Sequence, residues 1–355
     1  MKQELAAMIA LAERLVVSDT PGTLATLFSA RGSTYRTLGS MMVSLPGMHT
    51  GGVSGGCLEE YVARAGERAT RNTPAAMLQF STHRDAGDDA PVPGCGGSIE
   101  LLVERLTSNH LALLRQLAAA YDRDHASQLT TVVERSGHSL RVTREWLRPA
   151  EGSERKSHHA RPDADTDVLV HYIPPLTRLL IFGAGDDVRP LCDVGASLGW
   201  HVSIADRRAR LARRARFPNA DAVVAADWDD AIDALRFTPR TAAVLMTHSF
   251  EDDARVLSLI SRRDVAYIGA LGPAHRRQWL LEEMAAHGVR PSGELASRVR
   301  GPIGLDLGDR SAAGIAVAVA AEILARLNAR DARPLHKENP SSMMAARPGV
   351  CLVGA

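Results

Sequence analysis

The chain has 355 residues, of which 45% are hydrophobic and 23% charged, and its net charge at pH 7 is +1. This length predicts two domains, or three small ones, with enough apolar side chains to form buried cores. The nearly neutral charge balance argues against nucleic acid or an anionic membrane surface as the main partner.

The chain begins with an amphipathic helix pattern and not with the apolar core of a signal peptide. Its longest apolar run, residues 312–321, is too short to span a bilayer. The cysteines show no disulfide-framework spacing, and no Cys-x-x-Cys or His-x-x-x-His pair indicates a zinc site. We therefore expect a cytoplasmic protein with reduced thiols and no membrane association.

Residues 1–150 predict a mixed α+β domain. Helical periodicity begins at Met1 and recurs after Cys57 and over residues 111–121, whereas short apolar stretches between these helices have strand character. The expected strands cover residues 23–29, 41–45, 76–80, 99–103, 128–135 and 139–144. Residues 151–175 are expected to be a linker, because most of this segment is polar and charged.

Residues 176–330 show a different rhythm, in which apolar strands alternate with helices. The expected strands cover residues 179–182, 201–205, 222–225, 242–246 and 265–268, and the last helix covers 312–327. This alternation predicts a Rossmann-like α/β domain with a doubly wound parallel sheet. Residues 331–355 are expected to form a flexible tail.

Two strings set a cysteine among glycines: Gly51-Gly52-Val53-Ser54-Gly55-Gly56-Cys57-Leu58-Glu59-Glu60 and Pro93-Gly94-Cys95-Gly96-Gly97-Ser98-Ile99-Glu100. Glycine lets the backbone adopt positive φ and approach a ligand closely, so a thiol between glycines can face a ligand. The alternative is that both strings are hairpin turns with small buried cysteines. The candidate binding residues are Gly55, Gly56, Cys57, Cys95 and Gly96.

A second candidate site lies where the strand 179–182 turns into a helix through Gly183-Ala184-Gly185. Exposed N–H groups at such a turn attract phosphate, and a side chain at position 185 is expected to project toward that phosphate. Asp206 ends the next strand, at the distance where a carboxylate holds a ribose. Val188 replaces the third glycine of the fingerprint, so the alternative for Asp206 is a turn residue.

His248 follows the strand 242–246 and is a further candidate, because ligands of this fold collect at the carboxyl ends of the strands. The alternative is that His248 is structural or simply exposed.

Taken in order, these motifs resemble the XdhC/CoxI family, the accessory factors of xanthine dehydrogenase and related molybdenum hydroxylases. The resemblance is carried by the strings Arg31–Arg36, Gly51–Glu59, Gly94–Gly97, Leu180–Gly185, Met246–His248, Tyr267–Gly272 and Gly301–Gly308. One departure is Asp186, which stands where the family's glycine loop usually has histidine.

The resemblance implies a chaperone for the molybdenum cofactor (molybdopterin) and an accessory protein more than a catalyst. Such a protein shields the cofactor, lets a cysteine desulfurase install the terminal sulfido ligand, and helps to insert the cofactor into a xanthine dehydrogenase-type hydroxylase. Cys57 and Cys95 are then candidate molybdenum ligands, because a carrier needs a soft ligand near the metal. The Gly183–Gly185 loop would cradle the phosphate or nucleotide tail, and a homodimer is expected.

Two other interpretations stay open. The first is a NAD(P)-dependent oxidoreductase that uses the Rossmann-like domain, although no motif positions a proton donor. The second is a dimeric scaffold that docks sulfurase and hydroxylase, which would make both cysteines dispensable. A helix N-terminus favours a thiolate at Cys57, whereas Glu59 and Glu60 in the same turn oppose it.

Overall fold

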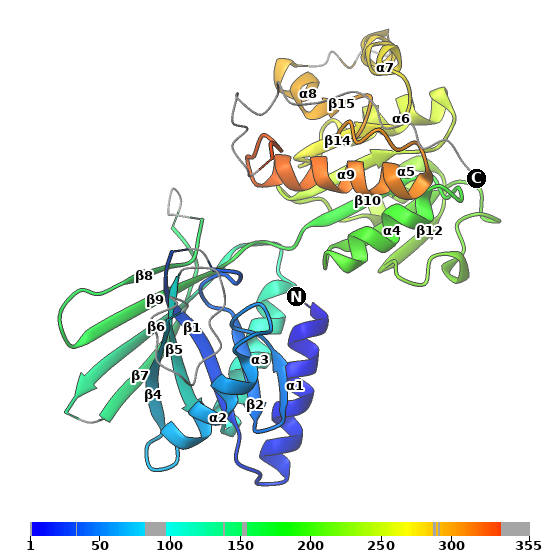
Figure 1. The fold of residues 1–355 in the computed structure, drawn as a ribbon. Helices are drawn as coiled ribbons and strands as arrows, with labels where there is room; N and C mark the ends of the chain where they lie inside the picture. The colour runs from blue at the N-terminus through cyan, green and yellow to red at the C-terminus, as the bar shows by residue number, and fades with distance from the viewer. Residues whose placement is uncertain are drawn as a thin grey trace, which may run out of the picture. The chain divides into compact units, whose positions relative to one another are not determined.

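The computed structural model describes residues 2–32, 34–81, 97–137, 139–150, 155–286, 289 and 292–334. It divides into two compact units, shown in Figure 1. The first comprises Met1–Arg178 with Ala196–His201, and the second comprises Leu179–Gly195 with Val202–Ala355. Most of the tail that was expected to be flexible, residues 335–355, lies outside the described residues.

The first unit contains a five-stranded antiparallel sheet in the order β3-β2-β1-β5-β4. Its strands are β1 (Thr23–Arg31), β2 (Met41–Leu45), β3 (Met48–Gly51), β4 (Ala75–Ser81) and β5 (Ser98–Arg105). Side chains alternate between its faces, so Ala25 and Leu27 pack under helix α2 (Glu59–Ala69), whereas Leu24 packs with the helices on the other face. Those helices, α1 (Lys2–Val17) and α3 (Ser108–Tyr121), lie side by side (Figure 1).

A second antiparallel sheet of the first unit has the order β7-β6-β9-β8. Its strands are β6 (Ser127–Ser136), β7 (Ser139–Leu147), β8 (His158–Ala160) and β9 (Thr166–Ile173). The expected linker over residues 151–175 is therefore wrong, because β8 and β9 lie within it. The sequence of β9 does not show the usual alternation of apolar and polar residues, because Asp167 and His171 occupy two of its four buried positions.

The second unit has a six-stranded sheet in the order β12-β11-β10-β13-β14-β15. Its strands are β10 (Arg178–Phe182), β11 (His201–Asp206), β12 (Ala222–Ala225), β13 (Thr241–Leu245), β14 (Tyr267–Ala270) and β15 (Val299–Arg300). Strand order reverses between β10 and β13, which is the switch point where ligands of this fold bind. The expected fold class, an α+β domain followed by a Rossmann-like domain, is confirmed.

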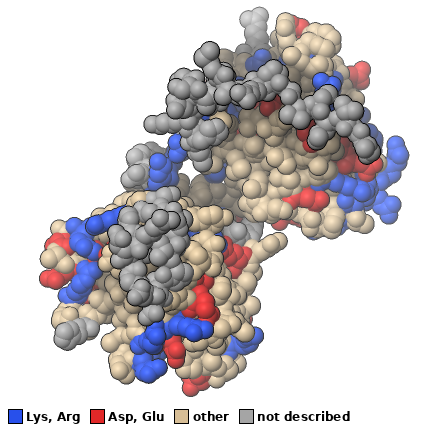
Figure 2. Space-filling model, in the orientation of Figure 1, with Lys and Arg blue, Asp and Glu red and all other residues tan. Residues whose placement is uncertain are grey.

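Six helices and one 3-10 turn connect or cover these strands in the described part of the second unit. They are α4 (Val188–Ser197), η1 (Arg214–Arg216), α5 (Trp228–Ala234), α6 (Phe250–Ile260), α7 (Ala274–Ala286), α8 (Gly293–Arg298) and α9 (Ala312–Leu327). No helix within the described ranges has the length and apolar character needed to cross a bilayer. Acidic and basic side chains are interspersed on the face of each unit seen in Figure 2, in keeping with the small net charge.

Candidate ligand-binding sites

The first candidate site is the loop between β3 and α2, which carries Cys57 in an exposed position. Gly51 begins this loop with φ +78°, and any side chain there would collide with the carbonyl oxygen of Met41. A Cβ atom at Gly56, which has φ +104°, would meet nothing within 4 Å, so the backbone beside Cys57 faces open space. Ser54 Oγ lies 3.7 Å from Cys57 Sγ. The thiol is thus accessible from solvent on a loop whose shape requires glycine.

The Cys57 loop is held by the carboxylate of Glu59, which is 3% exposed and turns inward beneath the loop. It accepts hydrogen bonds from the N–H groups of Val53 (3.2 Å), Ser54 (2.8 Å) and Leu58 (3.2 Å), and from Ser54 Oγ (2.6 Å). Burial opposes ionisation, but the bonds from Ser54 and Leu58 outweigh it and lower the pKa of Glu59.

Sequence reasoning treated Glu59 only as a charge that acts on Cys57 and missed this structural role. The available signal was an acidic residue in the first turn of a helix that follows a glycine-rich loop, where several N–H groups need acceptors. Glu60 behaves differently, since its carboxylate is exposed and pairs with Arg64 at 2.8 Å.

Tyr35 and Arg36, from the motif expected at residues 31–36, contact the Cys57 loop. Tyr35 is 80% exposed, and a Cβ atom at Gly55 would lie 3.4 Å from Cγ of its ring. Arg36 pairs with Glu4 at 2.9 Å, and a Cβ atom at Gly52 would lie 3.2 Å from its Nη2. The surface around Cys57 therefore combines an exposed thiol with an exposed aromatic ring.

Cys95 and Gly96, the second cysteine site expected from the sequence, lie outside the described residues. Across the described ranges, no group of three or more His, Cys, Asp and Glu side chains could hold a metal ion. A metal bound at Cys57 would therefore need its other ligands from elsewhere, such as a cofactor that carries its own.

The second candidate site lies at the switch point of the parallel sheet, where the loop after β10 meets the end of β13. Gly183 has φ +119°, and a side chain there would collide with the carbonyl oxygen of Met246. The Gly183–Gly185 loop and His248 are therefore neighbours, as the expected fold requires. His248 has φ +63°, and its Nε2 lies 2.9 Å from Asp187 Oδ2.

The surroundings of Gly185 differ from the expectation. A side chain at position 185 would collide with the carboxylate of Asp187 and would not point into open space where a phosphate could bind. Asp186 adds a second carboxylate to the same loop, where Arg216 contacts it at 2.8 Å. Two acidic side chains thus occupy the turn that would attract an anion in other Rossmann folds.

Asp206 ends β11 as expected but is only 2% exposed, and its oxygens are already used. They accept the N–H of Ala184 (2.8 Å), the N–H of Arg208 (2.8 Å), and Nε and Nη2 of Arg208 (2.9 and 2.7 Å). Burial opposes ionisation, but the bonds from Arg208 and Ala184 lower the pKa of Asp206. A carboxylate that accepts four hydrogen bonds has no acceptor site left for a ribose.

Two family models match the chain, the XdhC Rossmann domain over residues 179–323 and the XdhC and CoxI family over residues 15–81. A protein of Bacillus subtilis (strain 168), described as a probable xanthine dehydrogenase subunit, is 30% identical over 328 residues, which cover 88% of this chain and 95% of that protein. The chain belongs to the XdhC and CoxI family.

Two further relatives agree with this assignment. The molybdenum cofactor insertion chaperone PaoD of Escherichia coli (strain K12) is 25% identical over 334 residues, covering 89% of this chain and 86% of that protein. A crystal structure described as a xanthine dehydrogenase from Bacillus halodurans has a TM-score of 0.71 and 25% identity, covering 91% of this chain and 96% of that one.

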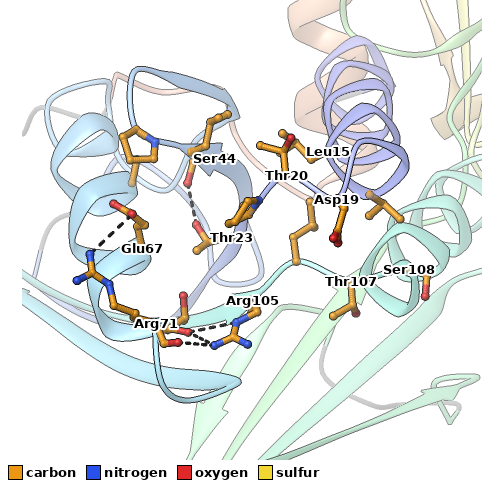
Figure 3. A pocket seen from close by; sticks show the side chains of 18 residues that line it. Leu15, Asp19, Thr20, Thr23, Ser44, Glu67, Arg71, Arg105, Thr107 and Ser108 are labelled. Atoms are coloured by element: carbon orange, nitrogen blue, oxygen red, sulfur yellow. Dashed lines mark hydrogen bonds and ion pairs between the residues drawn. The ribbon is translucent and has the colours of Figure 1, made fainter.

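The first unit of this XdhC-family chain also contains a cavity of about 710 Å³, at the opposite end of β1 from the Cys57 loop. Figure 3 shows some of its polar groups bonded within the protein: Thr23 Oγ1 lies 3.0 Å from Ser44 Oγ, and Arg105 donates to backbone carbonyl groups. Thr23, Ser44 and Arg105 therefore already use hydrogen-bonding capacity within the protein.

Proposed function

We propose that the protein is a chaperone that binds the molybdenum cofactor, protects it, supports its sulfuration and helps to insert it into a xanthine dehydrogenase-type hydroxylase. Membership of the XdhC and CoxI family and similarity to a molybdenum cofactor insertion chaperone support this function. The proposed setting is the cytoplasm, with a cysteine desulfurase as partner and a homodimer as the working form.

One observation carries the proposal: Cys57 is exposed on a loop that Glu59 fixes from below. A thiolate is a soft ligand suited to a metal–sulfur centre, and the bound cofactor would supply the metal and its remaining ligands. Tyr35, exposed beside Gly55, offers a flat aromatic surface to a planar ring. Cys57 would hold the metal end of the cofactor, and the open backbone at Gly56 would leave room for it.

The alternative function, a NAD(P)-dependent oxidoreductase, lacks support at the position that would hold the adenosine ribose. Both oxygens of Asp206 are engaged by Arg208 and the Ala184 N–H group, and the neighbouring loop carries Asp186 and Asp187. A dinucleotide would have to displace the hydrogen bonds of Arg208 and Ala184 before it could use this carboxylate.

The test is to purify the full chain from a molybdenum-replete host and to measure bound molybdenum by elemental analysis and bound pterin by its fluorescent oxidation products. A stoichiometric content of both is expected. Absence of both, together with saturable binding of NAD(P)H, would contradict the proposal and favour the oxidoreductase.

A further inference from the structure

A cavity of about 480 Å³ lies in the first unit, where the end of β1 faces β8 of the second antiparallel sheet. It is not part of the Cys57 loop or of the switch point. Its polar lining includes Ser29, Arg31, Glu100, Ser157, His158 and Arg161. Strand β1 places two of these groups on one side, because Ser29 is opposite Glu100 and Arg31 is opposite Ser98 in the sheet.

An excess of positive charge underlies this cavity. The fully buried carboxylate of Asp167 accepts hydrogen bonds from Arg161 Nε (2.7 Å) and from His159 Nε2 (2.9 Å), and it also pairs with Arg135. Burial opposes ionisation, but Arg161, His159 and Arg135 hold the pKa of Asp167 at about 2. Two arginines therefore share one carboxylate, and the side chain of Arg161 stays 43% exposed at the cavity wall.

One carboxylate in the cavity works against an anion. Glu100 Oε2 accepts the hydroxyl of Ser29 at 2.7 Å and lies 3.8 Å from Arg161 Nη2. Arg31 also lines the cavity. The cluster therefore contains three arginines, Arg31, Arg135 and Arg161, and two carboxylates, Asp167 and Glu100. The cluster therefore keeps a net positive charge even with Glu100 ionised.

Neutral donors also face this space. Ser157 Oγ accepts the N–H of Tyr172 at 3.1 Å, which leaves the hydroxyl hydrogen of Ser157 available to donate into the cavity. The Arg31 guanidinium is suited to the paired oxygens of a phosphate. Arg161 binds both oxygens of Asp167 through Nε and Nη2 (2.7 and 3.2 Å), so it would contact a phosphate oxygen through Nη1. The volume exceeds what one phosphate fills and lies in the range of sites for small organic ligands, about 300–1,000 Å³.

We propose that this cavity binds the phosphate group of a small phosphate monoester, with Arg31 and Arg161 on the phosphate oxygens and Ser157 as a neutral donor. The proposal concerns anion binding alone and does not depend on the cofactor function proposed above. It places an anion-binding site in the first unit. The sequence motif instead predicted one at the Gly183–Gly185 loop, where the structure shows the carboxylates of Asp186 and Asp187.

Isothermal titration of the full chain with glycerol 3-phosphate, orthophosphate and uncharged glycerol tests this proposal. Glycerol 3-phosphate is expected to bind more tightly than orthophosphate, and glycerol is expected not to bind. Arg31→Gln should weaken the monoester by about tenfold or more, because it removes a charge-assisted hydrogen bond. Glu100→Gln should tighten it, because it removes the carboxylate that repels the ligand.

Arg64→Gln is the matched control, since Arg64 is an exposed arginine of the same unit that pairs with Glu60 on α2, away from the cavity lining. It should leave the affinity unchanged, and thermal melting should show all three variants folded. The proposal is overturned if the parent chain binds no phosphate compound, if orthophosphate binds while the monoester is excluded, or if Arg31→Gln and Arg64→Gln have equal effects.

Discussion

Substitution of Glu59 by glutamine tests whether this carboxylate shapes the loop that presents Cys57. The glutamine has the same shape, but only one of its two terminal atoms is an acceptor. Glu59 Oε1 accepts two N–H groups, from Val53 and Ser54, and Oε2 accepts the N–H of Leu58 and the hydroxyl of Ser54. An amide nitrogen at the Oε2 position would leave the Leu58 N–H with Ser54 Oγ (3.3 Å) as its acceptor, and the Ser54 hydroxyl would have to accept from the new amide instead of donating.

The loss of the charge-assisted hydrogen bonds to this buried carboxylate should lower the free energy of unfolding by about 2 kcal/mol. Urea denaturation measures this change, and hydrogen exchange at residues 53–58 should speed up in the variant. Glu60→Gln is the control, because the Glu60 carboxylate pairs with Arg64 at the surface, where solvent screens the pair, and its loss should change the stability much less. Equal stabilities of Glu59→Gln and Glu60→Gln, with unchanged exchange in the loop, would refute the reasoning.

The stability of the parent chain should also depend on pH through Glu59. Its pKa in the folded protein is lowered from an ordinary value of 4.5, so its contribution is present above pH 4.5 and is lost as the pH falls below that value. Glu59→Gln should flatten this part of the acid denaturation profile.

Three further predictions concern buried carboxylates and the loop after β10. Asp206→Ala should lower the free energy of unfolding by about 2 kcal/mol whether or not a nucleotide binds, because Arg208 loses its partner; an unchanged urea midpoint would contradict this. Gly185→Val should lower the melting temperature, because the new side chain displaces Asp187. An unchanged melting temperature would contradict this prediction. Asp167 should stabilise the fold above its ordinary pKa of 3.8 and lose that effect as the pH falls toward 2, so an acid titration of Asp167→Asn that matches the parent would disprove its role.

Much of the fold could be predicted because its strands carry strong local signals. The apolar run before Gly183 indicated a buried parallel strand, and the glycine indicated a turn that a side chain would obstruct. Strand β9 carried no such signal, because Asp167 and His171 take inward positions that apolar residues usually fill. Their burial depends on partners from other segments, such as Arg135 and Tyr121, which a reading of local pattern does not supply.

The candidate sites could be located but not described from sequence. Motif spacing identified Cys57 and Asp206, and the structure places the first on an exposed loop and the second at a strand end. What the pattern could not give is the direction of neighbouring side chains. Glu59 turns inward to bind the loop, and Arg208 folds back onto Asp206, so each changes what its neighbour can do.

The most direct test of the account compares cofactor retention by the parent chain, Cys57→Ala and Cys192→Ala after purification from a molybdenum-replete host. Cys192 is a suitable control because its thiol is buried, out of reach of a ligand at the surface, and burial raises its pKa to about 11. The account predicts that Cys57→Ala loses bound molybdenum and pterin while its melting temperature stays close to that of the parent, and that Cys192→Ala retains both. Equal molybdenum and pterin contents in Cys57→Ala and the parent would contradict the central claim.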